Sequence, residues 1–474
     1  MPKKIKSLPK PGGIMEMLAV ALPMLVSMTC DTIMIFTDRL FLSKLEPEMM
    51  NASMGGGLTV FMMMSFFVGL TGYSTALVAQ YLGAGQKKNC PMVISQAVIV
   101  SCAAYLPILF CRPLAHQMFR LMGVSSQQLF YQNVYFDILL YGAIITLLRN
   151  SLSCFFSGIG RTRIVMIASF TAMLVNAILN YILIFGKLGL PAMGIRGAAL
   201  GTLMGGASGF FILVFAYFSK NNSAEFDLAH SFKFDFSIMK KLLRFGSSPG
   251  LELFLNILAF NAMVMVFHAQ GLVTATASTI MFNWDMVSFV PLLGIEIAVT
   301  SMVGRYMGAR NPYIANQSAM SGLKVGLVFS TIILILFVGF PHLLINVFRP
   351  AGSNVIFIKS IPMALYMIRV ASLYIMVEAL FIVFIGALRG AGDTFWAMCI
   401  SVTLHWAMVL VVAVALKVFK QTPEAAWTYM VVIFIGFSFI VYWRYRIGHW
   451  RNIKVVEIEP VPIISNGFHG TIDL

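Results

Sequence analysis

Two carboxylates stand inside a stretch that is otherwise apolar enough to cross a membrane. Asp31 and Asp38 lie in the apolar run that begins near residue 14. At about 100° per residue, their seven-residue spacing places them within about 20° of each other on one helix face and roughly 10 Å apart along the axis. Each carboxylate costs on the order of 2.5–3.5 kcal/mol at membrane depth unless it meets water, a cation or a partner. The pair therefore predicts a cation site in a cavity; the structural alternative is a pair near the helix end, reaching the interface or bonded to Thr32 and Thr37.

Four further acids fall in apolar runs of the second half of the chain: Glu252, Asp285, Glu296 and Glu378. Asp285 and Glu296 are eleven residues apart, so we expect them to share a helix face. Four acids in one membrane region need a counter-cation or a shared proton, which suits a carboxyl group that alternately holds and releases a proton. Each acid also has a structural reading as the partner of a basic or polar neighbour, and Arg149 and Arg369 are candidate counter-charges.

The composition identifies the class of protein. The chain has 474 residues, of which 59% are hydrophobic and only 11% are charged, and this predicts a polytopic membrane protein. The net charge of +15 comes from basic residues in short gaps between apolar runs, so they indicate membrane topology and no nucleic-acid partner. Six cysteines without CxxC spacing indicate neither a disulfide framework nor a zinc site.

Apolar runs of spanning length predict an all-α fold with twelve transmembrane helices. The runs cover about 14–42, 55–82, 92–111, 129–156, 162–186, 194–218, 242–270, 278–304, 319–347, 356–388, 394–419 and 424–443. Pro23, Pro249 and Pro291 are candidate kinks, although Pro249 could equally open a helix.

Lys and Arg are concentrated in the gaps on the side of the N-terminus, which predicts a multi-pass protein of the cell membrane with both termini in the cytoplasm. Residues 1–13 form the expected cytoplasmic N-terminal segment, which we interpret as retained and not as a signal peptide. Residues 444–474 form a cytoplasmic tail, expected at the membrane surface or disordered.

Two short stretches recur at a nearly constant offset. Residues 80–86, Gln-Tyr-Leu-Gly-Ala-Gly-Gln, return as Arg-Tyr-Met-Gly-Ala-Arg-Asn at 305–311. Residues 158–162, Gly-Ile-Gly-Arg-Thr, return as Gly-Ala-Gly-Asp-Thr at 390–394. The chain is therefore expected to contain an internal repeat.

The repeat predicts two pseudo-symmetric six-helix lobes. The N-lobe covers 14–218 and the C-lobe 242–443, joined by a polar cytoplasmic linker over 219–241. Because six is an even number, both repeats insert with the same orientation, about an axis along the membrane normal, and substrate is expected between the lobes.

The chain shows no phosphate-binding loop of the GxxxxGK[ST] type and no HExxH or GxSxG motif. We therefore predict a transporter driven by an ion gradient, without a cofactor, and not an enzyme. A polytopic enzyme or a receptor without transport is the alternative from another class.

Several of these motifs, taken in order, resemble the multidrug and toxic compound extrusion (MATE) family over about residues 14–420. Pro23, followed fifteen residues later by Asp38 and then by Ser-Lys-Leu at 43–45, is similar to the first helix of the family with its cation-binding aspartate. The stretches 175–186 and 194–202 are similar to the connection between the fifth and sixth helices.

The second half adds a further match. Glu378, eleven residues before Arg389 and Gly390, resembles the acidic residue and the Arg-Gly pair of the tenth helix of the family. Two departures stand out: Asn180 occupies a position where some relatives have Asp, and the acid of the seventh helix is Glu252, about one turn before Asn256, where the family's acid aligns.

The resemblance implies export of amphiphilic, cationic organic compounds in exchange for Na⁺ or H⁺ by alternating access. Carried over by position, an N-lobe cation site would comprise Asp38, Asn176, Asn180 and Thr202, of which the first three are possible Na⁺ ligands. Part of a C-lobe site would comprise Tyr374 and Glu378. Together with the acids found above, the candidate coupling and binding residues are Asp31, Asp38, Asn176, Asn180, Thr202, Glu252, Asn256, Asp285, Tyr374 and Glu378.

Na⁺ and H⁺ remain equally open as coupling ions, because carboxylate, amide and hydroxyl oxygens suit Na⁺ and a carboxyl alone suits H⁺. The expected partners are a small organic molecule and the lipid bilayer, with the protein acting as a monomer. A flippase for lipid-linked or polysaccharide precursors, from the same superfamily, is the alternative function; its anionic substrates would favour a basic cavity.

Overall fold

The computed structural model describes residues 10–121, 125–349 and 355–457, and this part of the chain contains helices and connecting segments without a strand. The first half contains α1 (Ile14–Ser43), α2 (Pro47–Gly72), α3 (Ser74–Gly83), α4 (Asn89–Phe110), α5 (Arg112–Leu121), α6 (Ser126–Tyr141), α7 (Ala143–Gly158), α8 (Thr162–Phe185) and α9 (Ile195–Tyr217). The linker contains α10 (Lys220–Phe226) and the 3₁₀ turn η1 (Leu228–His230). The second half contains α11 (Phe236–His268), α12 (Leu272–Gly308), α13 (Pro312–Gly339), α14 (Pro341–Asn346), α15 (Val355–Ala391), α16 (Thr394–Lys417), α17 (Pro423–Ile447) and the 3₁₀ turn η2 (His449–Asn452).

The helices agree with the predicted number of membrane spans. In the described part of the chain, eleven helices are long and apolar enough to cross a membrane, with α2 and α3 counted as one. The pair α6 and α7, bent by 47° at its break, makes a twelfth. The chain is thus an all-α, multi-pass membrane protein.

Local signals fix where individual helices begin and end. The Asp235 carboxylate accepts the backbone N–H of Ile238 at 2.8 Å and caps α11, which therefore starts at Phe236, inside the predicted linker. Pro249 lies inside α11 and does not open it. Gly186 takes a φ of 66° and ends α8, a left-handed conformation that glycine adopts without steric cost.

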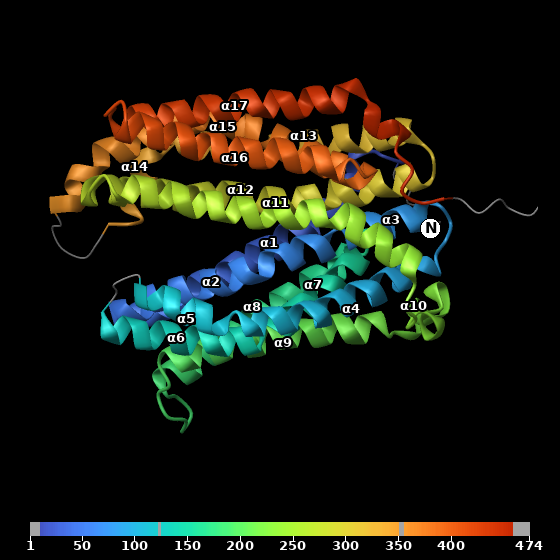
Figure 1. Cartoon of the computed structure of the whole chain (residues 1–474), viewed down its shortest axis with the longest axis horizontal. Coiled ribbons are helices and arrows are strands. Elements are labelled where there is room, and N and C mark those ends of the chain that lie inside the picture. Colours follow the sequence, from blue (N-terminus) through green and yellow to red (C-terminus); the bar gives the residue numbers. More distant parts are fainter. Residues whose placement is uncertain (1–9, 122–124, 350–354, 458–474) are drawn as a thin grey trace, which may run out of the picture.

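The helices form two lobes, α1–α9 and α11–α17, each with its own apolar core (Figure 1). The first helix of each lobe begins against the opposite lobe. Met17 and Val20 of α1 are buried in the same cluster as Val299 of α12, whereas Ile238 and Leu242 of α11 are buried in the N-lobe cluster. The first turns of α1 therefore pack in the C-lobe core, and the first turns of α11 pack in the N-lobe core.

The lobes approach each other at the end of the molecule that carries the N label and diverge toward the other end (Figure 1). We call these the terminal end and the distal end. The glycine contacts between the lobes lie in the terminal halves of the helices: a Cβ on Gly294 would lie 2.7 Å from the backbone nitrogen of Leu25, and one on Gly246 would lie 2.6 Å from the carbonyl oxygen of Leu70.

Part of the C-terminal tail also crosses between the lobes. Val455 and Val456 are buried in the N-lobe cluster, and Gln86 Nε2 donates to the carbonyl oxygen of Glu457 at 2.9 Å. Disorder is therefore the wrong expectation for residues up to 457, because two valines gain burial against the N-lobe. Residues 1–9 and 458–474, within the predicted N-terminal segment and tail, lie outside the described residues.

Candidate functional site

Four of the predicted residues meet in the N-lobe. Asp38 on α1 is 4% exposed, and its Oδ1 accepts N–H bonds from Asn176 at 3.0 Å and from Asn180. Its Oδ2 lies 2.5 Å from the Thr202 hydroxyl of α9. The two asparagines are one turn apart on α8 and so share a face. Gly201 lets α9 come close enough, since a Cβ there would lie 2.2 Å from Asn180 Oδ1.

The N-lobe group surrounds the Asp38 carboxyl with neutral hydrogen-bond partners. The Thr202 hydroxyl also lies 3.0 Å from the carbonyl oxygen of Ala198, and its single hydrogen can serve only one of the two acceptors. When it serves the carbonyl, Thr202 Oγ1 can accept a hydrogen bond from a protonated Asp38. Asn180 Oδ1 is buried without a hydrogen-bond partner among the described residues. The group can therefore hold a proton, and it has one free amide oxygen for a cation.

Asp31 is separate from this group. Its carboxylate forms an ion pair of 2.8 Å with Arg149 on α7. Asp31 and Asp38 share one face of α1 but have different partners. Arg149 also donates to Ser169 at 2.8 Å, and Ser169 bonds to Ser27 at the same distance. Arg149 is thus a counter-charge of Asp31, as its sequence position suggested. The structure links α1, α7 and α8 through this ion pair.

Three predicted residues of the C-lobe form a second group. Asp285 on α12 accepts a hydrogen bond from the Tyr374 hydroxyl of α15, and Ser288 donates to Glu378 Oε2 at 3.3 Å. Tyr374 and Glu378 are one turn apart on α15 and are 6% and 3% exposed. Neither acid forms an ion pair with a basic side chain in the part of the chain that the structure describes.

The other two C-lobe acids share one arginine. Arg389 on α15 contacts Glu252 of α11 at 2.9 Å through Nη2 and pairs with Glu296 of α12 through Nη1. Both carboxylates are buried, at 2% and 6% exposure. Asp285 and Glu296 therefore belong to different groups despite their common helix face. Arg389 ties three helices together and leaves this group with one net negative charge.

Asn256 lies apart from both acidic groups in its hydrogen bonding. Its Nδ2 donates to Ser401 Oγ at 2.9 Å, and its buried Oδ1 has no hydrogen-bond partner among the described residues. His405 Nδ1 lies 2.7 Å from the carbonyl oxygen of Ser401 on the same helix. The amide thus connects α11 to α16.

Ser288 and Arg389 contact the C-lobe acids and were not among the candidates. Ser288 stands three residues after Asp285, a spacing of one helical turn, and that spacing is the signal that could have found it. Arg389 was noted only within an Arg-Gly motif. That it pairs with acids on two other helices depends on tertiary packing, and one sequence carries no signal for it.

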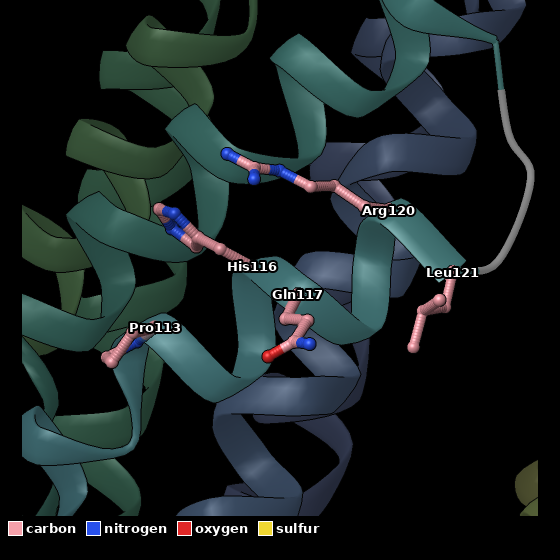
Figure 2. A pocket seen from close by; sticks show the side chains of 5 residues that line it. All are labelled: Pro113, His116, Gln117, Arg120 and Leu121. Carbon is pink, nitrogen blue, oxygen red and sulfur yellow. The ribbon is translucent and has the colours of Figure 1, made fainter.

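A pocket of about 500 Å³ opens beside α5, and Figure 2 shows the side chains that line it. Its lining residues are Pro113, His116, Gln117, Arg120 and Leu121. His116 and Arg112 both contact the carboxylate of Asp137, at 2.9 and 2.6 Å. The pocket contains none of the predicted site residues.

Comparison with known proteins places this geometry in context. The family model MatE matches residues 23–182 and 250–415, which is more than half of the chain. The chain is 27% identical over 394 residues to the "Probable multidrug resistance protein NorM" of Thermotoga maritima, covering 82% of each chain. It is 25% identical over 455 residues to the protein of the same name from Shewanella oneidensis, covering 94% of this chain and 98% of that one.

A solved structure shows the same fold. The crystal structure of MATE in complex with MaL6 superimposes with a TM-score of 0.84 at 20% sequence identity. The match covers 94% of this chain and 100% of that chain. The arrangement of two helical lobes is therefore the one found in that protein.

Proposed function

The chain belongs to the MATE family of transporters, and on this premise we propose that it exports amphiphilic, cationic organic compounds in exchange for Na⁺ or H⁺. The NorM relatives are named as multidrug resistance proteins, which supports drug extrusion as the direction and the class of cargo. Members of this family move solutes and do not catalyse a reaction. The cargo would bind between the lobes and be released by alternating access.

The observation that carries the proposal is that each lobe contains buried carboxyl groups whose hydrogen-bond partners are neutral. Asp38 meets two amides and a hydroxyl, and Asp285 and Glu378 meet Tyr374 and Ser288. A buried carboxylate without a cation is costly, so such a group takes up a proton or a metal ion when the site closes. Reversible occupancy of this kind is what couples an ion gradient to a change of conformation.

The two acidic groups of the C-lobe have different roles in this proposal. Asp285, Tyr374 and Glu378 would bind the coupling ion or the cationic cargo, because no arginine among the described residues pairs with either acid. Glu252 and Glu296 are already neutralised in part by Arg389. Asp31, paired with Arg149, would act through the position of α1 and not as a direct ligand.

The proposed orientation follows from the charges of the connecting segments. The linker and the segments at the terminal end carry most of the Lys and Arg residues, which by the positive-inside rule puts the terminal end in the cytoplasm of a cell-membrane protein. The lobes diverge at the distal end (Figure 1), which would then face outward. This is the orientation that release of an exported compound requires. We further propose that the protein acts as a monomer without a cofactor, because the residues proposed to bind the ion and the cargo belong to one pair of lobes.

Purified protein in liposomes tests the proposal. A cationic dye is loaded, and a Na⁺ gradient and a pH gradient are imposed one at a time. We expect dye movement under at least one gradient, and at least a tenfold slower rate in Asp38→Asn and in Glu378→Gln, because an amide cannot exchange a proton. Glu225→Gln is the matched control, since Glu225 lies in the linker and contacts Lys87 and Arg161.

Three outcomes would contradict the proposal. Unchanged gradient-driven export in both variants would show that these acids do not form the coupling site. Movement of an anionic lipid-linked precursor, without movement of cationic dyes, would favour the flippase alternative. Absence of any solute flux under either gradient would favour a membrane protein that does not transport.

A further inference from the structure

The recurring stretches found in the sequence meet in space at the terminal end. Residues 80–86 and 158–162 belong to the N-lobe, and 305–311 and 390–394 belong to the C-lobe. The coupling and cargo sites do not include any of the four. Each stretch lies where a helix ends at the terminal end, on α3, α7, α12 and α15.

The first pair of copies makes a reciprocal backbone contact. A Cβ on Gly83 would lie 1.8 Å from the carbonyl oxygen of Arg305, and a Cβ on Gly308 would lie 2.0 Å from the carbonyl oxygen of Gln80. In each copy the glycine stands three residues after the residue whose carbonyl meets the other glycine. At these two glycines the helix ends therefore touch through backbone atoms, in a contact related by the pseudo-two-fold axis of the repeat.

Side chains of the stretches 80–86 and 305–311 contact the other two stretches, 158–162 and 390–394. Gln80 Nε2 donates to the carbonyl oxygen of Gly390 at 2.8 Å. Arg305, the counterpart of Gln80 in the repeat, lies over Gly160, where a Cβ would lie 2.4 Å from Nη2 of the arginine. Gly160 stands two residues after Gly158, the counterpart of Gly390. Stretch 80–86 thus contacts stretch 390–394, and stretch 305–311 contacts stretch 158–162, in each case on the opposite lobe.

Further bonds seal the same junction. The Ser301 hydroxyl of α12 donates to the carbonyl oxygen of Ser157 at 2.6 Å, and the Tyr306 hydroxyl donates to Glu16 Oε2 of α1 at 2.8 Å. Glu16 also forms an ion pair of 3.5 Å with Arg305. These three polar contacts therefore also join α12 to the N-lobe at the terminal end.

We propose that the four stretches form one inter-lobe clamp, which closes the terminal end in this conformation and must separate when the terminal end opens. The proposal rests on alternating access as given above. At Gly83 and Gly308 the opposing helix ends meet through backbone carbonyls and not through interlocked side chains, so these contacts can part and rejoin without a change of rotamer. The clamp would set how readily the lobes rock about the terminal end.

Alanine substitution tests the clamp by preventing its closure. For Gly83→Ala or Gly308→Ala to be accommodated, the opposing carbonyl oxygen must retreat by about 1 Å or more, since Cβ contacts under 3.0 Å do not occur. Gly304→Ala should act more weakly, because its Cβ would lie 3.1 Å from the nearest atom. Gly72→Ala is the matched control, with nothing within 4 Å.

Electron-spin distance measurements report the result without requiring transport. Two spin labels on exposed sites at the terminal end, Arg163→Cys and Tyr313→Cys, measure its closure, and labels at Leu188→Cys and Leu272→Cys measure the distal end. The full-length protein is used with its six native cysteines replaced.

We expect longer terminal-end distances in Gly83→Ala and Gly308→Ala, a smaller increase in Gly304→Ala and none in Gly72→Ala. Ion-driven export should fall at least tenfold in the first two variants. If the first two variants keep the distances of the control, the clamp is wrong even where transport supports the proposed function. If they do not fold, Gln80→Ala and Tyr306→Phe remove hydrogen bonds without adding bulk, and unchanged terminal-end distances in both would overturn the proposal equally.

Discussion

Removing the shared arginine of the C-lobe should destabilise the protein strongly. Arg389 is the ion-pair partner of both Glu252 and Glu296, and these acids are 2% and 6% exposed. Arg389→Met keeps most of the side-chain volume and deletes the charge. The substitution changes the net charge of the group from one negative to two, with no other ion pair to these acids among the described residues.

The size of the effect follows from burial. Breaking a buried ion pair by removing one partner costs about 3–5 kcal/mol, because the remaining charge is left uncompensated. Arg389→Lys should cost less, on the order of 1–2 kcal/mol, because one ammonium group can hardly serve two carboxylates held by a planar guanidinium. The triple variant Arg389→Met, Glu252→Gln, Glu296→Gln should recover most of the loss, because no charge remains buried there.

The free energy of unfolding is measured on purified protein by titration with a denaturing detergent, followed by tryptophan fluorescence. Arg163→Met is the control, since Arg163 is exposed at the start of α8 and its loss should stay within about 0.5 kcal/mol. Glu252→Gln keeps the pair between Arg389 and Glu296, so it should cost less than Arg389→Met.

Two results would refute this account of the arginine. A loss below about 1 kcal/mol in Arg389→Met would mean that water or a proton compensates the two acids in place of the guanidinium. A triple variant no more stable than Arg389→Met would mean that the arginine acts through packing and not through its charge.

Two further predictions concern other ion pairs. Asp31→Asn should lower the free energy of unfolding by about 1 kcal/mol, less than Arg389→Met, because Asp31 is partly exposed and Arg149 keeps its hydrogen bond to Ser169; a loss as large as that of Arg389→Met would contradict this. Hydrogen bonds from Lys87, and then from Arg161, lower the pKa of Glu225 below its ordinary value, so its contribution is present above the unfolded-state pKa and is lost as pH falls through the folded pKa. The protection of the α10 amides, measured relative to the intrinsic exchange rate at each pH, should therefore fall on acidification below about pH 4.5, and Glu225→Gln should show the lower protection already at neutral pH; equal protection in both proteins at pH 7 would contradict it.

The sequence was sufficient for the architecture because membrane insertion imposes a strong pattern. Runs of about 20 apolar residues are required for each span, and these runs predicted the spans, with ends that differ by up to 8 residues from the observed helices, as for 319–347 against Pro312–Gly339. The break between α6 and α7 did not interrupt the apolar run 129–156, so periodicity could not reveal the bend of 47°.

The sequence could not predict which acids pair with an arginine. Spacing placed Asp31 with Asp38, and Asp285 with Glu296, on common helix faces. In the structure Arg149 forms an ion pair with Asp31, and Arg389 forms one with Glu296. A helix face predicts which side chains point the same way, whereas their partners come from other helices.

The amino-acid sequence by itself determined the class of protein, the number of spans, the repeat and the candidate acids, because each depends on local composition or on spacing along one helix. Only the tertiary structure decided which acids are paired with arginine and which meet neutral partners, because an ion pair depends on helices that are distant in sequence and close in space. It also decided that the four recurring stretches meet at one end of the molecule. A repeat fixes the symmetry of two lobes, but the place where they touch is set by how α1 and α11 each begin against the opposite lobe.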